Sequence, residues 1–341
     1  MSKAWLPSAS ISTLQQRAQI MASIRQFFYE RSVLEVETPS LSHATITDPH
    51  LSALSTKHTE PGASTSNTLY LQTSPEYAMK RLLAARSGDI FQLCKSFRDD
   101  EVGAHHNPEF TMLEWYRLGF SMQDLINEVG ELLIQILPIS EVEQFTYSEL
   151  FEQYCNFSPL TASVDTILSC CKQVGLASYI ASIEQQLTLK QPSQALQGEQ
   201  AILLKDSALQ VLFNQEIEPH IGQEIPAVVS HFPASQAALA TLADDGLSAH
   251  RFEVYFKGLE LANGFNELQD AAIQKQRFLA DNEKRKTLGL PVNEIDTHFM
   301  SALEAGLPAC SGVALGVDRL IMLALNKQNI KEVLSFNYDN C

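Results

Sequence analysis

The sequence predicts an α+β fold in which an antiparallel sheet is flanked by helices. Apolar residues recur every three to four positions in several segments, which predicts amphipathic helices. Other short apolar runs are joined by loops or tight turns instead of helical crossovers, which favours antiparallel pairing. The chain has 341 residues, of which 45% are hydrophobic, and this is enough for a sizeable core.

The N-terminal part predicts a helix and then a strand. Apolar residues recur at helical spacing through residues 12–30, and Ser12 is a suitable N-cap. The stretch SVLEVETPSL (32–41) alternates in character, which predicts a strand, and Pro39 limits its length. Residues 43–68 are polar and rich in Ser and Thr, so we expect a loop or hairpin there.

A strand and a second helix follow. Residues 69–73 have the pattern of a strand, and residues 74–85 that of a helix. Ser74 can cap this helix, and Pro75 suits its first turn. Glu76 suits the positive end of the helix dipole.

The middle of the chain predicts a long-looped hairpin and then a helical region. Residues 90–98 and 110–120 each predict a buried strand, joined by a loop. Residues 121–138 predict another amphipathic helix. Residues 141–225 contain a Gln-rich stretch and no strong motif, and we interpret them as a mostly helical insertion.

The stretch RFEVYFKGLELANGFNEL (251–268) predicts a hairpin with a tight turn at Lys257 and Gly258. With that turn, position 255 faces 260 and position 253 faces 262. Glu253 and Glu260 then project from one face, with Cβ atoms roughly 7 Å apart. Oxygen ligands at this range suit Mg²⁺ that also carries phosphate oxygens. Two glutamates on a wet sheet face would give the same pattern, so both interpretations stay open.

The stretch 311–325 predicts a glycine-bearing strand followed by a helix. Gly312 and Gly316 remove side chains from the strand, so a flat ligand could approach the backbone. Arg319 falls in the first helical turn, where a cation opposes the helix dipole, and this suggests that it serves an anion such as a phosphate. A local pair with Asp318 or another acidic residue is the alternative.

Arg98 ends the strand before the long loop. It is a planar, permanent cation suited to phosphate or carboxylate. Glu114 and Tyr116 alternate on the returning strand and therefore share a face. His105 and His106 are adjacent in sequence, which favours polar loop contacts over metal ligation. A charged surface hairpin is the alternative interpretation of the whole segment.

Composition excludes several function classes. The net charge is −16 and no Lys/Arg run is present, which argues against nucleic-acid binding. The chain has no run of 18 apolar residues, which a membrane span would need. Its start, MSKAWLPSAS, lacks the apolar core of a secretion signal. The 6 cysteines form no CxxC or Cys/His ligand spacing, which is typical of reduced cysteines in a cytoplasmic protein.

Four ordered segments resemble those of the class II aminoacyl-tRNA synthetases, specifically the lysyl branch. SVLEVETPSL resembles motif 1, FRDDEVGAHHNPEFTMLEWY motif 2 and GVALGVDRLIML motif 3. LELANGFNEL resembles the substrate segment of the lysyl branch. The match extends over residues 12–325. It implies a single class II catalytic domain over residues 1–341, with the helical insertion at about 141–225.

Lysyl-tRNA synthetases carry an N-terminal barrel that binds the anticodon. Here the catalytic pattern begins by residue 12, so we expect no anticodon-binding domain. The chain therefore resembles the stand-alone paralogues that attach (R)-β-lysine to a lysine of elongation factor P. The resemblance implies a homodimer through motif 1, and neither tRNA nor a membrane as partner.

Three alternatives remain: an enzyme that acts on tRNA, one that acts on a small amine, and a non-catalytic regulatory paralogue. The last would have lost its phosphate-binding residues, yet Arg98, Arg319, Glu253 and Glu260 are present.

The resemblance also implies ATP and Mg²⁺ as ligands and assigns the site residues. Arg98 and Arg319 would be catalytic. The residues expected to bind ATP are Arg98, Asp99, Asp100, Asn107, Glu260, Leu261, Gly316 and Arg319. The residues expected to bind the lysine-like substrate are Ser74, Pro75, Glu76, Tyr116, Glu267 and Ala314. Glu253 and Glu260 would coordinate the metal.

Three positions depart from the family pattern. Asp100 stands where motif 2 usually has glutamate, and Ala104 stands where the loop is often basic. Ala314 stands where lysyl-tRNA synthetases usually have glycine. Its methyl group would narrow the space near the substrate amine. The hypothesis is that a β-amino acid fits there better than its α-isomer.

Overall fold

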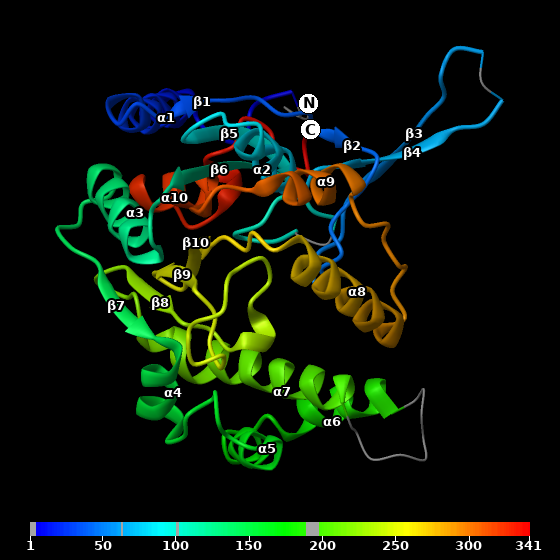
Figure 1. Ribbon diagram of the computed structural model, residues 1–341. Helices are drawn as coiled ribbons and strands as arrows, with labels where there is room; N and C mark the ends of the chain where they lie inside the picture. The colour runs from blue at the N-terminus through cyan, green and yellow to red at the C-terminus, as the bar shows by residue number, and fades with distance from the viewer. Residues whose placement is uncertain (1–4, 63, 100–101, 189–197) are drawn as a thin grey trace. The chain divides into compact units, whose positions relative to one another are not determined.

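The computed structural model confirms an α+β fold made of helices and mostly antiparallel strands (Figure 1). The structure describes residues 5–62, 64–99, 102–188 and 198–341. It divides into two compact units. Unit 1 comprises Met1–Ser140, Gln269–Ala272 and Asn293–Cys341. Unit 2 comprises Glu141–Leu268 and Ile273–Val292.

Unit 1 is built on a sheet with the strand order β1-β5-β6-β11, in which only β1 and β5 are parallel. Its strands are β1 (Leu34–Glu35), β2 (Leu41–Ser42), β3 (Ser55–His58), β4 (Asn67–Leu71), β5 (Ile90–Phe97), β6 (Glu109–Leu118) and β11 (Cys310–Gly316). Its helices are α1 (Ile11–Glu30), α2 (Glu76–Ala84), α3 (Met122–Ile136), α9 (Thr297–Gly306), α10 (Val317–Ala324) and the 3₁₀ turn η4 (Ile330–Glu332). The hairpin of β3 and β4 extends from the rest of unit 1 (Figure 1).

Buried aromatic side chains join helix α1 to the sheet of unit 1. The ring of Phe28 stacks on Phe91 of β5, with centroids 4.6 Å apart. It also meets the edge of Trp115 of β6 at 5.2 Å. Aromatic pairs of this kind add to the free energy gained by burying their area. The indole N–H of Trp115 donates to Glu128 of α3 at 3.0 Å, so α3 is fixed to the same strand.

Two predicted caps are wrong by one or two residues. Ser10, not Ser12, caps α1, because its side chain accepts a hydrogen bond from the Thr13 N–H. Pro75, not Ser74, occupies the N-cap of α2. The Ser74 hydroxyl still accepts from the Glu76 N–H at 3.0 Å, so it satisfies one of the free donors of the first turn. The motif 1 strand is also shorter than expected, since β1 has only 2 residues.

Unit 2 contains strands in the order β10-β9-β8-β7 and most of the remaining helices. Its strands are β7 (Glu143–Thr146), β8 (Ala227–Ser230), β9 (Arg251–Phe256) and β10 (Leu259–Asn266). Its helices are α4 (Tyr147–Cys155), α5 (Val164–Gln173), α6 (Ala177–Thr188), α7 (Glu199–Leu212), the π-helix η1 (Phe213–Ile217), the 3₁₀ turns η2 (Glu218–His220) and η3 (Ala234–Gln236), and most of α8 (Ala271–Leu288). The described residues of 141–225 are thus mostly helical, with strand β7 in addition.

The core of unit 2 is separate from the aromatic cluster of unit 1. Apolar side chains of α4, α5 and α7 pack together around Tyr147, Phe151 and Phe213. A capping box of Thr146 and Glu149 fixes the start of α4 directly after β7. Unit 2 therefore has a hydrophobic core of its own. Within the described residues, no helix is both long and apolar enough to cross a membrane.

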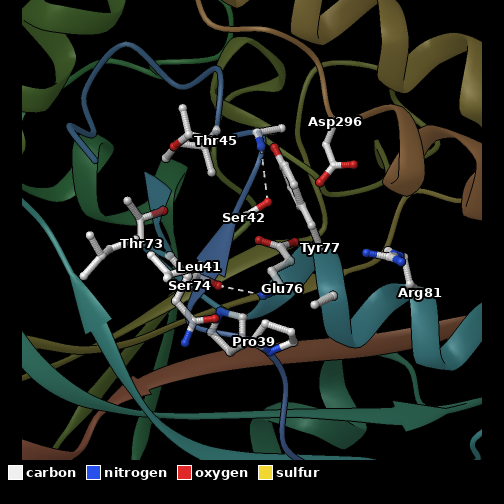
Figure 2. Close-up of a pocket in the computed structure, with 16 residues that line it drawn as sticks. Pro39, Leu41, Ser42, Thr45, Thr73, Ser74, Glu76, Tyr77, Arg81 and Asp296 are labelled. Carbon is white, nitrogen blue, oxygen red and sulfur yellow. Dashed lines mark hydrogen bonds between the residues drawn. The ribbon is translucent and has the colours of Figure 1, made fainter. Parts of the chain in front are cut away.

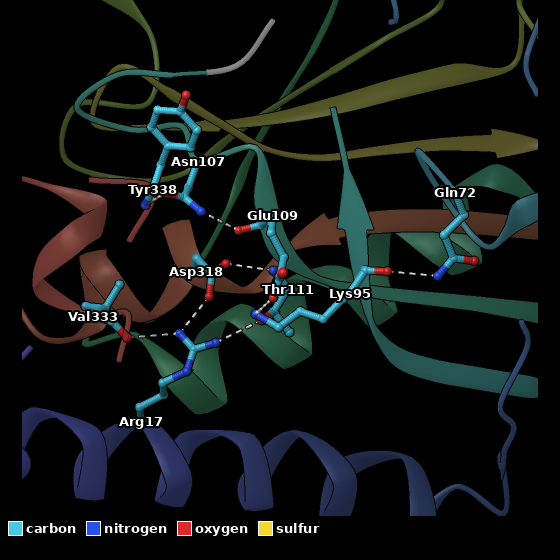
Figure 3. A network of polar contacts seen from close by, with 9 residues as sticks. All are labelled: Arg17, Gln72, Lys95, Asn107, Glu109, Thr111, Asp318, Val333 and Tyr338. Carbon is cyan, nitrogen blue, oxygen red and sulfur yellow. Dashed lines mark hydrogen bonds and ion pairs between the residues drawn. The ribbon is translucent and has the colours of Figure 1, made fainter. Parts of the chain in front are cut away.

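A buried ion pair fixes the start of α10 in unit 1 (Figure 3). The carboxylate of Asp318 lies 2.6 Å from the guanidinium of Arg17 on α1, and its side chain is only 2% exposed. The same carboxylate accepts a hydrogen bond from the Thr111 N–H of β6 at 2.7 Å. Arg17 also donates to the hydroxyl of Thr111 and to the carbonyl of Val333. One cation thus ties α1, β6 and α10 together, and it sets the position of the residue after Asp318.

We expect Arg17→Met to lower the free energy of unfolding of unit 1 by about 3 kcal/mol or more, because it leaves the Asp318 carboxylate buried without its cation. Tryptophan fluorescence during urea unfolding measures this, since both tryptophans, Trp5 and Trp115, belong to unit 1. Arg25→Met is the control. It breaks a half-exposed pair with Glu35, which should cost about 1 kcal/mol or less. Equal losses in the two variants would contradict the role given to Arg17.

Candidate active site

Arg98 directly follows β5 and begins the loop to β6. Its N–H donates to the carbonyl of Pro108 at 2.9 Å, which closes the base of this loop. Its guanidinium carbon lies 5.1 Å from the centre of the Phe110 ring. The side chain is half-buried. The predicted hairpin is confirmed, because β5 and β6 pair from Ile90 with Tyr116 to Phe97 with Glu109.

Arg319 approaches the same loop from the first turn of α10. Its Nε donates to the carbonyl of His105 at 3.3 Å, and its Nη2 contacts the Nε2 of His106. The two cations, predicted from separate segments, therefore both lie against the β5–β6 loop. His106 makes a polar contact within unit 1, as the sequence analysis expected for a histidine that is not a metal ligand.

The other predicted ATP-binding residues of unit 1 differ in their surroundings. The Asp99 side chain is exposed, and its N–H donates to the carbonyl of Ser52 at 3.0 Å. Asp100 lies outside the described residues. The Asn107 amide is held at both ends, since Nδ2 donates to the carbonyl of Glu109 at 2.7 Å and Oδ1 accepts from the Tyr338 N–H at 2.9 Å (Figure 3). Asn107 thus connects the motif 2 loop to the C-terminal segment.

Gly316 is the N-cap of α10, next to the phosphate-site candidate Arg319. A Cβ atom added at Gly316 would lie 3.7 Å from Cδ of Arg319, which is an ordinary contact distance. Its φ of −74° is also open to any residue. Packing within the described part of the chain therefore does not require a glycine at this position. A ligand that approaches the backbone closely would require one.

A cluster of polar side chains joins β6 to the start of α2. The carboxylate of Glu114 accepts hydrogen bonds from the hydroxyl of Tyr116 at 2.6 Å and from that of Ser74 at 2.7 Å. Glu76 lies in the first turn of α2, and its carboxylate contacts the ammonium of Lys80 at 2.5 Å. Three predicted substrate residues, Ser74, Glu76 and Tyr116, are therefore brought together around a carboxylate that was not predicted as a site residue.

Glu114 is only 2% exposed, and this burial controls its charge. Burial and the negative charge of Glu76 raise the pKa of Glu114 to about 7. Hydrogen bonds from Tyr116 and Ser74 and the positive charge of Lys80 lower the pKa in turn. A buried carboxylate with this set of partners is suited to accept a ligand cation. The sequence did hold a signal, since Glu114 is a charged residue within the otherwise apolar run of a buried strand.

Ala314 of β11 lies directly opposite Glu114 of β6. Directly opposite residues on antiparallel strands place their side chains on the same face. The methyl group of Ala314 therefore belongs to the surroundings of the Glu114 carboxylate. The proximity of Ala314 to a substrate amine stays a prediction.

A pocket opens beside the N-terminal end of α2 (Figure 2). Ser74, Pro75 and Glu76, which were predicted to bind the substrate, are among the residues that line it. Further residues of its wall were not predicted: Ser42, Thr45, Tyr77, Arg81 and Asp296 are among them. They come from the loop after motif 1, from α2 and from the N-cap of α9. None of these segments carried a motif, so only the folded chain brings them together.

In unit 2, the predicted turn of the β9–β10 hairpin is confirmed. Lys257 and Gly258 have φ angles of 50° and 72°, as a tight two-residue hairpin turn requires. Glu260 lies opposite Tyr255, as expected. Glu253, however, lies opposite Asn263 and not opposite position 262, because a β-bulge follows Glu260. The predicted partner of Glu253, position 262, is therefore wrong, whereas the pairing of Glu260 with Tyr255 leaves the two glutamates diagonal to each other on one face.

The negative charges of Glu253 and Glu260 both affect Tyr255 of the hairpin. Burial raises the pKa of Tyr255 well above its usual value, and the negative charges of Glu253 and Glu260 raise it further. The Glu253 carboxylate pairs with Arg251 and accepts hydrogen bonds from the Tyr255 hydroxyl and from the Asn263 amide. The Oδ1 of Asn263 is buried and has no hydrogen-bond partner within the described part of the chain. Both oxygens of Glu253 thus have partners within the hairpin, and the described residues contain no group of three or more acidic, His or Cys side chains that could hold a metal ion.

The remaining predicted residues of unit 2 are Leu261 and Glu267, which are 2% and 1% exposed. Leu261 is part of β10, and Glu267 follows its last residue. The predicted site residues thus fall into two groups. Those of unit 2 are Glu253, Glu260, Leu261 and Glu267, and the other described ones belong to unit 1.

Known proteins resemble this chain over nearly its whole length. A family model described as "tRNA synthetases class II (D, K and N)" matches residues 6–340. A protein of Pseudoalteromonas translucida is 53% identical over 334 residues, which are 98% of this chain and 97% of the relative. Proteins of Erwinia tasmaniensis and Salmonella paratyphi B are each 51% identical, over 338 and 336 residues and at least 98% of either chain. All three relatives are named elongation factor P–(R)-β-lysine ligase.

The matched residues 6–340 include the β5–β6 loop that Arg98 begins, the first turn of α10 with Arg319, and the buried cluster around Glu114. Because the family model covers residues 6–340 and the relatives share more than half of their residues with it, this chain belongs to the class II tRNA synthetases (D, K and N).

Proposed function

We propose that this protein activates (R)-β-lysine with ATP and transfers it to a lysine side chain of elongation factor P. The observation that carries the proposal is the similarity, over nearly the full length of both chains, to relatives named for this activity. The buried cluster of Glu76, Glu114 and Tyr116 supports it, because these groups suit a substrate that carries ammonium groups.

In the first step, the carboxylate of the amino acid attacks the α-phosphorus of ATP. A bond forms between the carboxylate oxygen and this phosphorus, and the bond to the bridging oxygen breaks, so pyrophosphate leaves. A carboxylate is already ionised at neutral pH and needs no general base. The contribution of the protein is therefore to position the reactants and to stabilise the charge that spreads over the phosphates.

Arg98 and Arg319 supply this charge in the proposal. A guanidinium group matches the geometry of phosphate oxygens and stays protonated at any physiological pH. Asp99, Asp100, Asn107, Leu261 and Gly316 complete the proposed ATP site. Glu253 and Glu260 would hold Mg²⁺, and the bound ion would neutralise charge on the phosphate oxygens.

In the second step, the neutral amine of an acceptor lysine attacks the activated carbonyl carbon. An amide bond forms, the bond to the AMP oxygen breaks, and the amine releases a proton. We propose that Ser74, Pro75, Glu76, Tyr116, Glu267 and Ala314 hold the amino acid through both steps. The acceptor is a lysine of a protein that reaches the site from solution.

We further propose that the protein works as a homodimer in the cytoplasm. Strand β1 is the edge of the unit 1 sheet, and Leu34 on it is 53% exposed. Tyr29 and Leu41, which flank β1 in sequence, are 52% and 46% exposed. Apolar side chains at a sheet edge suit a symmetric contact with a second copy. All 6 cysteines are free, as is usual for a reducing compartment.

The proposed reaction is tested by pyrophosphate exchange with (R)-β-lysine and with α-lysine, together with the intact mass of elongation factor P. We expect faster exchange with (R)-β-lysine and a gain of one lysyl group on the factor. The same reaction mixture with tRNA in place of the factor should leave no acid-precipitable label. Labelled tRNA with an unmodified factor would show that the chain acts on tRNA, and exchange without either product would indicate a small amine as acceptor. Absence of exchange would favour a regulatory paralogue.

Substitution of Ala314 by glycine tests the proposed selectivity. Removing the methyl group opposite Glu114 should raise the ratio of α-lysine to β-lysine activation by roughly tenfold, since one methyl group is worth about 1–3 kcal/mol in a pocket. Pyrophosphate exchange with both amino acids gives this ratio. Ala309→Gly, just before β11, is the control and should leave it unchanged. An unchanged ratio in Ala314→Gly would remove the selectivity hypothesis.

Light scattering after size-exclusion chromatography tests the dimer. We expect the mass of two chains for the unmodified protein and that of one chain for Leu34→Asp, since a carboxylate buried without a partner opposes association. Leu242→Asp is the control, because Leu242 is 42% exposed but lies in unit 2. A single-chain mass for the unmodified protein would refute the dimer.

A further inference from the structure

Lys80 is a buried cation that the proposed reaction has not used so far. It lies on α2 and is only 1% exposed. It follows Glu76 by four residues and therefore shares its helix face. Its ammonium contacts the Glu76 carboxylate at 2.5 Å and lies 5.9 Å from the centre of the Phe299 ring. A lysine is seldom fully buried without a charged partner, so this position indicates a specific electrostatic role.

The electrostatic influence of Lys80 extends past Glu76 to Glu114. Its positive charge is among the causes that lower the pKa of Glu114, against burial and the charge of Glu76. Ser74 links the two carboxylates mechanically, because its hydroxyl donates to Glu114 and accepts from the N–H of Glu76. Lys80, Glu76, Ser74 and Glu114 thus form one continuous polar cluster within unit 1.

The net charge of this cluster suits one substrate ammonium group. When Glu114 is ionised, two carboxylates and one ammonium sum to −1, which is the charge needed to receive one ammonium group of the substrate. Without Lys80, two carboxylates would share a buried site, and such pairs hold on to a proton. The protonated Glu114 would then offer the substrate no negative charge.

We propose that Lys80 is a positioning residue for the amino-acid substrate: it orients the Glu76 carboxylate and keeps the cluster at a single negative charge. This inference rests on the proposed function, because it assumes a substrate with an ammonium group. It assigns Lys80 no contact with the substrate itself.

Other groups near Glu114 leave this charge balance intact. On β5, Gln92 lies opposite Glu114 and is uncharged, and Cys94 lies on the same strand. Burial and the charge of Glu114 raise the pKa of Cys94 to about 12, so its thiol stays neutral around pH 7. On β11, the residue opposite Glu114 is Ala314. Among the described residues of unit 1, the charges that act on Glu114 come from Glu76 and Lys80 of α2.

The test compares Lys80→Met with the unmodified protein in pyrophosphate exchange from pH 6 to pH 9. Methionine keeps the apolar stem and removes the charge. Loss of the positive charge raises the pKa of Glu114, so the acid limb of kcat/KM for (R)-β-lysine should move to higher pH. A shift of one unit lowers kcat/KM on that limb by about tenfold. The KM for ATP should stay within about twofold, because the triphosphate contacts are unchanged.

Two further variants separate charge from packing. The double variant Lys80→Met/Glu76→Gln again leaves one carboxylate, so its acid limb should return toward that of the unmodified protein. This outcome cannot arise from a merely structural loss. Lys80→Arg keeps the charge and should keep the pH profile. Lys286→Met is the control, since Lys286 forms a comparable pair with Glu283 on α8, where both side chains are exposed.

The outcomes also separate this inference from the proposed function. If the unmodified protein exchanges pyrophosphate but Lys80→Met keeps its pH profile and KM for (R)-β-lysine, the role of Lys80 is refuted while the function stands. If the double variant fails to regain the acid limb, the charge balance is refuted. If the unmodified protein uses only α-lysine, the assignment of β-lysine as substrate is refuted. The same series of variants with α-lysine then tests the role of Lys80.

Discussion

The burial of the Glu114 carboxylate is the constraint on which the rest of the site depends. Glu114 lies on β6, between the paired strands β5 and β11, and its side chain is only 2% exposed. A charge placed there is costly unless hydrogen bonds and an opposite charge compensate it. Tyr116 and Ser74 supply the hydrogen bonds. Lys80, which contacts Glu76, supplies the positive charge. The position of α2 against β6 follows from this compensation.

The phosphate side of unit 1 is organised by a second buried charge. Asp318 is held by Arg17 and by the Thr111 N–H, so the first turn of α10 is fixed to β6. This directs Arg319 toward the loop that Arg98 begins. The strand β6 therefore takes part in both arrangements: the Thr111 N–H donates to Asp318, which precedes Arg319, and Glu114 accepts from Ser74 and Tyr116.

Much of the fold and of the site could be predicted from the sequence, for identifiable reasons. The β9–β10 hairpin was predicted because Lys257-Gly258 is a local turn signal, and Arg98 and Arg319 because cations at element ends are conspicuous. The bulge after Glu260 was not predicted, since the offset of a register depends on packing of the whole pair. The cap of α1 was misplaced because Ser8, Ser10 and Ser12 are close together, and that of α2 because Ser74 and Pro75 both precede its first residue. Lys80 was missed because an amphipathic helix with a lysine normally exposes it, and its burial is set only by tertiary contacts.

The most direct test of this account is the pKa of Glu114 itself, measured by NMR on protein with carbon-13-labelled glutamate carboxyl groups. The Glu114→Gln variant assigns the signal. The account predicts a pKa of about 7 in the free protein and a clear decrease when (R)-β-lysine is added, since a bound ammonium stabilises the ionised carboxylate. A pKa that does not change when the amino acid binds would contradict the central claim that Glu114 and its neighbours receive the substrate ammonium.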